Sequence, residues 1–262
     1  MTTVNDILKF VESIAPPYMK ESWDNVGLNC GRMDREGTKI LVALDPFEGV
    51  CQEAKAVGAD LLITHHPLIF RAPNALTDDT ALGRCVLFLA QNGISAINAH
   101  TNLDCAPGGV NDVLAATLGL KDTQVIAPAG TNEDGLPYGL LRCGHVTEQP
   151  LEDFLAHIKS SLGCSGLRYV NSGKPVSKVA VGGGSCAGAM LDAIAAGCDT
   201  CVTADMKYHQ FLDAAGKGIN LMDAGHFPTE DPVCGKLVSY LTAQFPELSV
   251  TKSTSHKEVI QY

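Results

Sequence analysis

Two adjacent histidines, His65 and His66, are the residues of this sequence best placed to do chemistry. They follow the apolar run ADLLIT, which predicts a buried strand, and Pro67 starts a loop directly after them. Burying two imidazoles would be costly, because each ring has two nitrogens that need partners. An α/β protein instead presents functional groups where its strands end, so the pair is a candidate ligand pair.

Two other predicted strands end in a histidine that an acid follows one helical turn later. The run ISAINAH ends at His100 and precedes Asp104, and the run INLMDAGH ends at His226 and precedes Glu230. One turn of chain can bring His226 and Glu230 to the same ion. Thr229 is expected to cap a helix that begins at Glu230.

Imidazoles and carboxylates at three strand ends predict a metal centre, although any one of these histidines alone is more simply explained as a surface residue. With a bridging carboxylate and a bridging water, such ligands can hold two divalent ions about 3.5–4 Å apart. Nitrogen and oxygen ligands without thiolate admit Zn, Mn, Fe, Co or Ni, so the identity of the metal stays open. The expected ligands are His65, His66, Asp104, His226 and Glu230.

Three further residues are candidate catalytic groups. Asp205 and His209 lie in the run TADMKYHQ, where a helix is predicted to start, and His100 ends its own strand. We expect these side chains to support the metal ligands or to transfer protons. The simpler alternative for Asp205 and His209 is an ordinary helix start.

The segment ESWDNVGL contains the only tryptophan of the chain, Trp23. Its Asp, Asn and Gly residues predict a loop. Two interpretations stay open: Trp23 fills a gap in the core, or the polar loop around it borders a functional site.

Strand and helix signals alternate along the chain and predict an α/β fold with largely parallel sheets. A helix over 3–14, capped by Thr3 and Asp6, comes first and stops at Pro16 and Pro17. Strands are predicted over 39–45, 59–64, 94–100, 139–146, 167–173, 178–182, 198–203 and 219–226. Helices are predicted over 47–57, 78–92, 110–118, 151–162, 187–196 and 206–216.

The alignment of residues 39–64 on residues 178–203, without gaps, indicates an internal repeat. This alignment places the pair His65-His66 on Ala204-Asp205, so the two copies differ where the strand ends. A slightly different offset aligns His100 with His226 and Asp104 with Glu230.

The repeat predicts two similar α/β lobes that face each other, with the metal centre between their strand ends. The first lobe is expected to comprise residues 1–125 and 226–262, and the second lobe residues 126–225. The two copies are not equivalent, because the first has the paired imidazoles His65-His66 where the second has Ala204-Asp205.

Composition excludes several classes of protein. The 262 residues are 45% apolar and have a formal net charge of −10, which indicates a globular chain without a basic surface for nucleic acid. The N-terminal residues lack the features of a signal peptide and no run is long enough to span a membrane, so a cytoplasmic location is expected. The CxxC pair Cys198 and Cys201 lies in a predicted strand and is expected to be structural.

A dinucleotide-binding motif is the rival interpretation. The run Gly182 to Ala187 (GGGSCA) matches G-x-G-x-x-A, and Asp205 follows about where such folds place a ribose-binding acid. Glycine-rich turns also serve close packing alone, and the first lobe has Leu44-Asp45-Pro46 at the matching place. We therefore rank dinucleotide binding below metal binding.

Five boxes in order, SWDNVGL, ITHHPLIF, AHTNLD, TADMKYHQ and AGHFPTE, resemble the dinuclear metal-centre family of Nif-three-like proteins, known as GTP cyclohydrolase I type 2 homologues. The resemblance spans nearly the whole chain. It implies a two-lobed fold assembled as a toroidal homohexamer, a trimer of dimers, with metal pairs that face an internal cavity. By the family pattern Glu230 bridges both ions. The short connection near 121–150 resembles that of members without an inserted domain.

The resemblance implies a metal-dependent hydrolase of the GTP cyclohydrolase type 2 kind, with the purine ring or a phosphoester of a nucleotide as the expected target. The alternative is a non-catalytic protein that binds or delivers metal, or that serves as an interaction scaffold. The chemistry of the ligands alone does not separate these two hypotheses.

Overall fold

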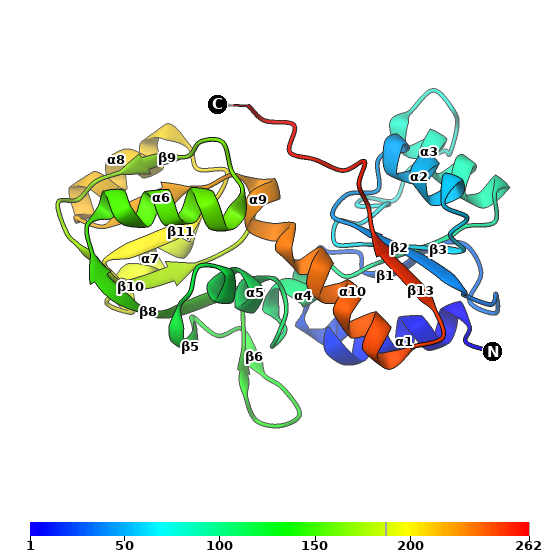
Figure 1. Cartoon of the computed structure of the whole chain (residues 1–262), viewed down its shortest axis with the longest axis horizontal. Coiled ribbons are helices and arrows are strands. Elements are labelled where there is room, and N and C mark those ends of the chain that lie inside the picture. Colours follow the sequence, from blue (N-terminus) through cyan, green and yellow to red (C-terminus); the bar gives the residue numbers. More distant parts are fainter. Residues whose placement is uncertain (187, 262) are drawn as a thin grey trace. The chain divides into compact units, whose positions relative to one another are not determined.

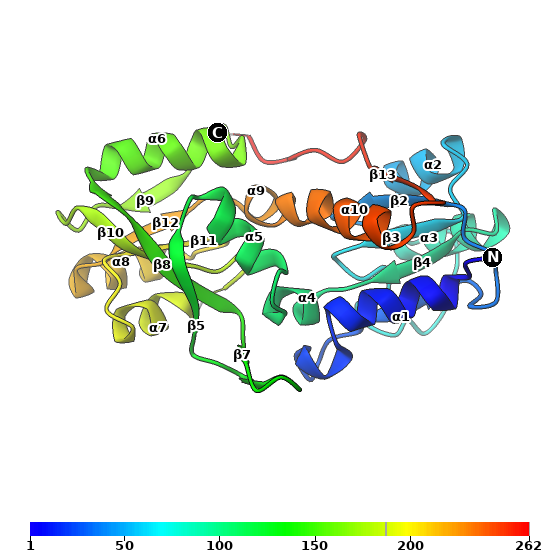
Figure 2. The same ribbon diagram turned by 60° about the horizontal axis from the view of Figure 1, so that its bottom comes forward.

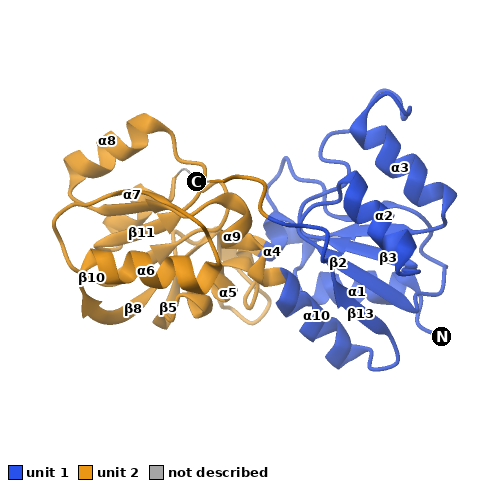
Figure 3. Ribbon diagram, turned by 45° about the horizontal axis from the view of Figure 1, so that its top comes forward, with its two compact units in different colours: residues 1–103, 234–257 blue, residues 104–233, 258–262 orange. Residues whose placement is uncertain are grey.

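The computed structural model describes residues 1–186 and 188–261 and has a mixed α/β fold (Figure 1). The chain divides into two compact units, each discontinuous in sequence (Figure 3). Unit 1 comprises residues 1–103 and 234–257, and unit 2 comprises residues 104–233 and 258–262. These boundaries differ from the predicted ones, because residues 104–125 and 226–233 pack in unit 2.

The sheet of unit 1 has five strands in the order β1-β4-β3-β2-β13. The four strands β4, β3, β2 and β13 are parallel, as the continuous apolar runs predict, and β1 pairs antiparallel with β4. The two edge strands were not predicted, since both are short and neither contains a continuous apolar run. The bounds are β1 (Gly27–Cys30), β2 (Lys39–Ala43), β3 (Leu61–Thr64), β4 (Ser95–Asn98) and β13 (Ser249–Lys252).

Helices cover both faces of this sheet. Leu41 and Ala43 of β2 pack with α2 and α3, and the alternate residues Ile40 and Val42 are buried on the opposite side, where α1 and α10 lie (Figures 1 and 2). The predicted capping box of α1 is present at Thr3. The bounds are α1 (Val4–Ile14), a 3₁₀ turn (Pro17–Met19), α2 (Glu48–Ala56), α3 (Ala81–Gln91), α4 (Thr101–Cys105) and α10 (Pro232–Gln244).

The main sheet of unit 2 has six strands in the order β5-β8-β10-β11-β12-β9. Only its central strands β10, β11 and β12 are parallel, and β5, β8 and β9 run antiparallel to their neighbours. The bounds are β5 (Lys121–Ile126), β8 (Leu141–Gln149), β9 (Arg168–Val170), β10 (Val176–Val181), β11 (Thr200–Thr203) and β12 (Asn220–Asp223), with a small hairpin of β6 (Gly130–Thr131) and β7 (Pro137–Tyr138).

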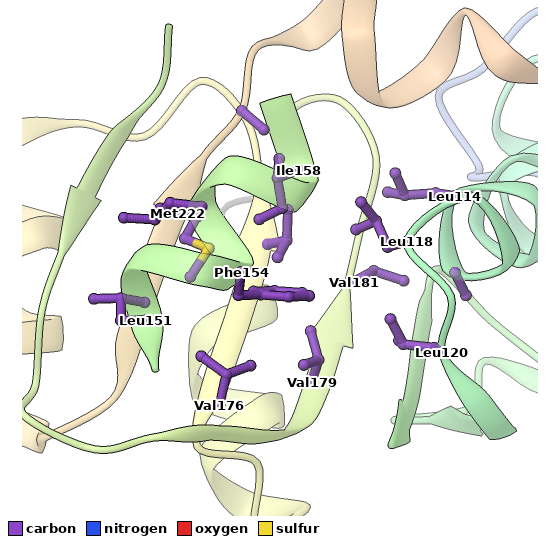
Figure 4. Packing of buried hydrophobic residues seen from close by; sticks show 14 of the residues in the cluster. Leu114, Leu118, Leu120, Leu151, Phe154, Ile158, Val176, Val179, Val181 and Met222 are labelled. Carbon is purple, nitrogen blue, oxygen red and sulfur yellow. The ribbon is translucent and has the colours of Figure 1, made fainter. Parts of the chain in front are cut away.

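Helices α5 and α6 pack on one face of this sheet, and α7 and α8 pack on the other. Figure 4 shows the fully buried Phe154 of α6 above Val176 and Val179 of β10, with Leu114 of α5 and Leu118 just after this helix beside them. This packing explains why residues after 103 belong to unit 2, since α5 buries Leu114 and Ala115 in the same apolar cluster as α6. The bounds are α5 (Val110–Thr117), α6 (Leu151–Leu162), α7 (Ala189–Ala195), α8 (Tyr208–Lys217) and α9 (His226–Glu230).

The repeated segments β2-α2-β3 and β10-α7-β11 use the same hydrogen bonds. Asp60 accepts bonds from the backbone amides of Thr38 and Lys39, at 2.9 and 3.1 Å. Asp199 does the same for the amides of Ser177 and Lys178, at 3.1 and 2.8 Å. An aspartate before the second strand therefore fixes the start of the first strand in both copies.

The third strands of the two units, β4 and β12, align with a shift of one residue from the predicted alignment. Ala99 donates its amide to Thr64 at 3.1 Å, and Ala224 donates to Thr203 at 2.9 Å, so Ala99 and Ala224 are equivalent. His100 then corresponds to Gly225. The proposed match of His100 with His226 is wrong by one residue, because sequence identity alone cannot resolve a shift of one position in a strand.

The helix expected to begin at Glu230 instead ends there. Gly225 has a φ of 89°, which starts α9 at His226, and the hydroxyl of Thr229 donates to the carbonyl of Gly225 at 2.8 Å. Pro232 occupies the first position of α10, where the missing N–H costs nothing. The prediction therefore placed the start of this helical segment at Glu230, whereas it begins at His226.

Cys198 and Cys201 are both buried, and burial raises the pKa of the Cys198 thiol to about 12. Burial likewise raises the pKa of Cys201. Both shifts favour the neutral thiol that a structural role requires. Across residues 1–186 and 188–261, none of the helices has the length and apolar character needed to span a membrane.

Candidate metal centre

Three imidazoles of unit 1 gather at the ends of β3 and β4. His65, His66 and His100 each place one ring nitrogen within 4.8 Å of the others. The centroids of the His65 and His66 rings are 4.9 Å apart, and the His100 ring lies 5.3 and 5.5 Å from them. The parallel pairing of β3 with β4 brings these strand ends together, as expected for a functional edge of an α/β sheet.

His65 and His66 are both held through Nδ1. The Nδ1 of His65 lies 2.8 Å from the carbonyl oxygen of Ala99, and the Nδ1 of His66 lies 2.6 Å from Oδ1 of Asp45. A carbonyl oxygen can only accept, so Nδ1 of His65 carries the proton and Nε2 carries the lone pair. Ligating histidines usually have this arrangement, in which an oxygen fixes the tautomer and the ring orientation.

Asp45 supports His66 and is itself fixed by a second histidine. Nε2 of His256 lies 3.1 Å from Oδ2 of Asp45. Burial raises the pKa of the Asp45 carboxyl, but hydrogen bonds from His256 and His66 outweigh burial and hold the pKa well below its usual range. Asp45 therefore stays ionised and accepts the Nδ1 proton of His66 at neutral pH.

His100 is held in the same way by Asp24. Its Nδ1 lies 2.8 Å from Oδ1 of Asp24, whose other oxygen accepts the backbone amide of Thr101 at 3.0 Å. Burial raises the pKa of Asp24, but the bonds from His100 and Thr101 prevail and lower it to about 2. All three histidines of the cluster are thus oriented through Nδ1.

In unit 2, His226 lies at the start of α9 and Glu230 at its end. Nε2 of His226 is 3.0 Å from Oε2 of Glu230. Nδ1 of His226 is 2.7 Å from Oδ2 of Asp205. His226 therefore resembles His66 and His100 of unit 1. A carboxylate holds its Nδ1, and its Nε2 is the candidate metal-binding nitrogen.

Asp104 supplies a second carboxylate in unit 2. Its oxygen and that of Glu230 lie within 4.8 Å of each other, and the two residues are only 8% and 4% exposed. Two buried carboxylates at this separation repel each other. A divalent cation coordinated by both would offset this repulsion, so the donor set of unit 2 fits a metal ion.

The glycine-rich turn after β10 encloses the side chain of Glu230. Gly184 has a φ of 60°, and a Cβ at this position would lie 1.9 Å from Oε1 of Glu230. The amide of Gly184 donates to Oγ1 of Thr229 at 3.0 Å, and the amide of Gly183 donates to Oδ1 of Asn111 at 2.7 Å. The glycines are therefore needed for close packing around Glu230.

These contacts argue against the dinucleotide interpretation. The amides of Gly183 and Gly184, which would bind a pyrophosphate, are bonded to side chains of unit 2, and Asp205 is bonded to His226. Ala187, the last position of the motif and the first of the predicted helix 187–196, lies outside the described residues.

The structure groups most of the residues predicted from sequence. Unit 1 brings together His65, His66 and His100, and unit 2 brings together Asp104, His226 and Glu230, with Asp205 behind His226. His209 is exposed in the first turn of α8 and belongs to none of the ligand groups found among the described residues.

Sequence reasoning missed three supporting residues. Asp24 lies in the SWDN loop, for which a position beside a functional site was one of the two open interpretations, so its role could have been inferred there. Asp45 ends the apolar run KILVAL, a signal of the same kind as His65 at the end of the next strand. His256 follows β13 in a segment without any recognisable pattern.

Comparisons with known proteins place these residues in context. A family model described as Duf34/NIF3 (NGG1p interacting factor 3) matches residues 2–258. A protein of Clostridium perfringens (strain 13 / Type A), named GTP cyclohydrolase 1 type 2 homolog, is 40% identical over 236 residues, which is 89% of each chain.

Two solved structures have a similar fold. The Bacillus cereus protein related to NIF3 has a TM-score of 0.94 at 26% identity, over 100% of this chain and 99% of that chain. Reduced HcgD from Methanocaldococcus jannaschii has a TM-score of 0.79 at 29% identity, over 96% of this chain and 97% of that chain.

Proposed function

Because the chain belongs to the Duf34/NIF3 (NGG1p interacting factor 3) family, we propose that it binds two divalent metal ions per subunit. The family resemblance drawn from the sequence boxes is confirmed by this match. The observation that carries the proposal is that four imidazoles are each held at Nδ1 by an oxygen, which presents Nε2 as a ligand. The proposed ligands are His65, His66, Asp104, His226 and Glu230.

The proposed activity is hydrolysis of a nucleotide or phosphoester, as the name of the Clostridium perfringens relative supports. When bound, two divalent ions supply Lewis acidity that activates water at neutral pH and polarises the scissile group. His100, oriented by Asp24, is the proposed proton-transfer group. The carboxylate of Asp205 positions His226 by accepting the Nδ1 proton of that ring.

Replacement of Glu230 tests the metal assignment. Glu230→Gln is expected to remove bound metal and turnover together, because the amide cannot supply the charge that two cations require. Elemental analysis of the purified variant, beside wild type and the exposed control Glu133→Gln, measures the stoichiometry. Two metals per chain and full activity in Glu230→Gln would show that the assignment is wrong.

A second candidate function is a metal-binding scaffold without catalysis. The description of the family as an interacting factor favours it. Incubation of the metal-loaded protein with a nucleotide panel that includes GTP separates the two candidates. Turnover that follows metal content and is lost in His65→Ala supports the hydrolase, and tight exchangeable metal without any product supports the scaffold.

The proposed assembly is a homohexamer, a trimer of dimers. It rests on the family resemblance, and light scattering coupled to size exclusion measures it directly. A mass of six chains supports the assembly, and a mass of one or two chains at micromolar concentration contradicts it. The same proposal includes a cytoplasmic location and no nucleic-acid partner, in keeping with the net charge of −10.

A further inference from the structure

Three aromatic rings of unit 1 form a surface beside the histidine cluster, and we call Trp23, Phe70 and His100 the aromatic surface. Trp23 and Phe70 are 57% and 44% exposed. Leaving a large apolar side chain in water forgoes the stabilisation that burial in the core would give. Trp23 therefore does not fill a gap in the core, and the pair of exposed rings is of the kind that marks a binding site.

The three rings contact one another edge to face. The centroids of Trp23 and Phe70 are 5.6 Å apart, and His100 lies 6.1 Å from Trp23 and 6.3 Å from Phe70. His100 is also one of the three imidazoles whose nitrogens lie within 4.8 Å of each other. The aromatic surface is thus continuous with the candidate ligands of unit 1.

Hydrogen bonds fix the two loops that carry these rings. The side chain of Asn25 donates to the carbonyl of Ile69 at 2.6 Å, which ties the Trp23 loop to the Phe70 loop. The side chain of Asn98 donates to the carbonyl of Asn25 at 2.9 Å, which ties both loops to the end of β4. Rings held in this way lose little conformational entropy when a ligand binds.

We propose that the aromatic surface binds the planar base of a nucleotide, and this inference rests on the proposed nucleotide-directed function. A base can stack on exposed aromatic rings, and such stacking adds to the affinity for the ligand. Arg71 adds a positive charge, because its Cζ lies 5.9 Å from the centroid of Phe70 on the exposed loop. A guanidinium beside the base is suited to a phosphate of the same ligand.

Trp23 makes the inference directly measurable, because it is the only tryptophan of the chain. Titration with guanosine, GTP, CTP and inorganic triphosphate is followed through its fluorescence, with correction for absorbance by the ligand. We expect saturable quenching by guanosine and GTP, weaker quenching by CTP with its smaller ring, and none by triphosphate alone. Quenching by triphosphate equal to that by GTP would overturn base stacking.

Phe70→Leu removes one ring of the surface and keeps an apolar side chain. We expect the dissociation constant for guanosine to rise roughly tenfold, as loss of one stacking contact predicts. Phe47→Leu is the matched control, since Phe47 is 43% exposed in the same unit and is not part of the aromatic surface. Equal weakening in both variants, or none in Phe70→Leu, would overturn the inference.

Arg71→Gln separates base from phosphate recognition. It is expected to weaken GTP binding severalfold and to leave guanosine binding unchanged, because guanosine has no phosphate. Equal weakening of both ligands would remove Arg71 from the proposed phosphate contact. A fluorescence change that follows protein concentration and not nucleotide would assign the aromatic surface to a contact between copies of the chain and overturn the inference.

Nucleotide binding and hydrolysis are measured separately, so that either proposal can be contradicted without the other. The fluorescence titration is repeated with Glu230→Gln, whose substitution lies in unit 2. Quenching without turnover in every protein would retain the nucleotide site and contradict the hydrolase. Turnover in wild type without quenching, together with an unchanged KM in Phe70→Leu, would retain the hydrolase and contradict the aromatic surface as a base-binding site.

Discussion

The segments β2-α2-β3 of unit 1 and β10-α7-β11 of unit 2 have the same order of elements, and in both an aspartate before the second strand accepts backbone amides of the first. They differ at the residues that follow the second strand. Unit 1 presents His65 and His66 there, and unit 2 presents Ala204 and Asp205. The two segments therefore share their backbone arrangement and differ in the side chains that follow the second strand.

The equivalent positions have complementary roles in the two units. His66 is a proposed ligand whose Nδ1 is held by Asp45, a residue on a neighbouring loop. Its counterpart Asp205 is itself the carboxylate that holds the Nδ1 of His226. The repeat therefore supplies a ligand in one copy and the support of a ligand in the other, so sequence identity between the copies is a poor guide to function.

The largest effect is expected from Gly184→Ala, which tests the turn found only in unit 2. The new Cβ would lie 1.9 Å from Oε1 of Glu230, at a φ of 60°. Strain and displacement of Glu230 should cost roughly 3 kcal/mol or more of stability and abolish metal binding by unit 2. Urea denaturation and elemental analysis measure both effects.

Gly188→Ala is the control for that variant, because a Cβ at Gly188 meets nothing within 4 Å. It should change stability by less than about 0.5 kcal/mol. A Gly184→Ala protein with wild-type stability and metal content would mean that the turn tolerates a side chain, and the proposed role of this turn would be withdrawn.

Loss of the carboxylates that hold Nδ1 compares the two units directly. Asp45→Asn and Asp205→Asn should each weaken metal binding roughly 10–100-fold, the usual effect of losing a hydrogen-bonding partner of a ligating histidine. Competition with a chromophoric chelator measures the affinity, and the exposed Asp134→Asn is the control. If only one variant loses affinity for metal, the two units do not both depend on a carboxylate that holds Nδ1 of a ligating histidine.

Asp60→Asn and Asp199→Asn test the feature that the two segments have in common. Each aspartate accepts two backbone amides and a hydroxyl, so its loss should destabilise the protein by about 1–3 kcal/mol. Chemical denaturation gives the free energy of unfolding. Unequal losses in the free energy of unfolding would show that the two aspartates contribute differently to the stability of the two sheets.

The smallest effect concerns a contact of unit 1 alone. Glu53 of α2 accepts hydrogen bonds from Ser253, Thr254 and Ser255 after β13. Burial raises its pKa, but these bonds prevail and lower the pKa to about 2. Because the folded pKa is depressed, the contribution to stability is present above the unfolded pKa of about 4.3 and is lost as the pH falls towards 2.

Glu53→Gln should therefore lower the melting temperature by roughly 2–4 °C at pH 7. The difference from wild type should shrink steadily between pH 4 and about 2. Scanning calorimetry over this range measures it. A difference that stays constant with pH would mean that the charge of Glu53 does not stabilise the contact.

Much of the fold could be predicted from sequence, because long apolar or amphipathic runs specify their own period. Helix α6 has the predicted bounds, β3 and β11 end at the predicted residue and begin two residues later than predicted, and β2 begins at the predicted residue and ends two residues earlier. The edge strands β1 and β13 could not be predicted, since a short strand without a continuous apolar run is defined by the neighbour it pairs with.

The candidate site was predictable where a functional residue ends a buried strand. His65 and His66 met that condition and lie together with His100, as expected. The supporting contact of His256 with Asp45 was not predictable, because it joins residues far apart in sequence. The one-residue shift at His100 was missed for a related reason: only strand pairing, not residue identity, fixes the register.

The discontinuity of unit 1 has a consequence for synthesis of the chain. Strand β13 pairs with β2 and is made only after all of residues 104–233. On the ribosome, unit 2 can complete its main sheet while the β2 edge of unit 1 still lacks its partner. An open strand edge is prone to pair with other chains. Premature termination near residue 245 should therefore leave a folded unit 2 attached to an aggregation-prone unit 1.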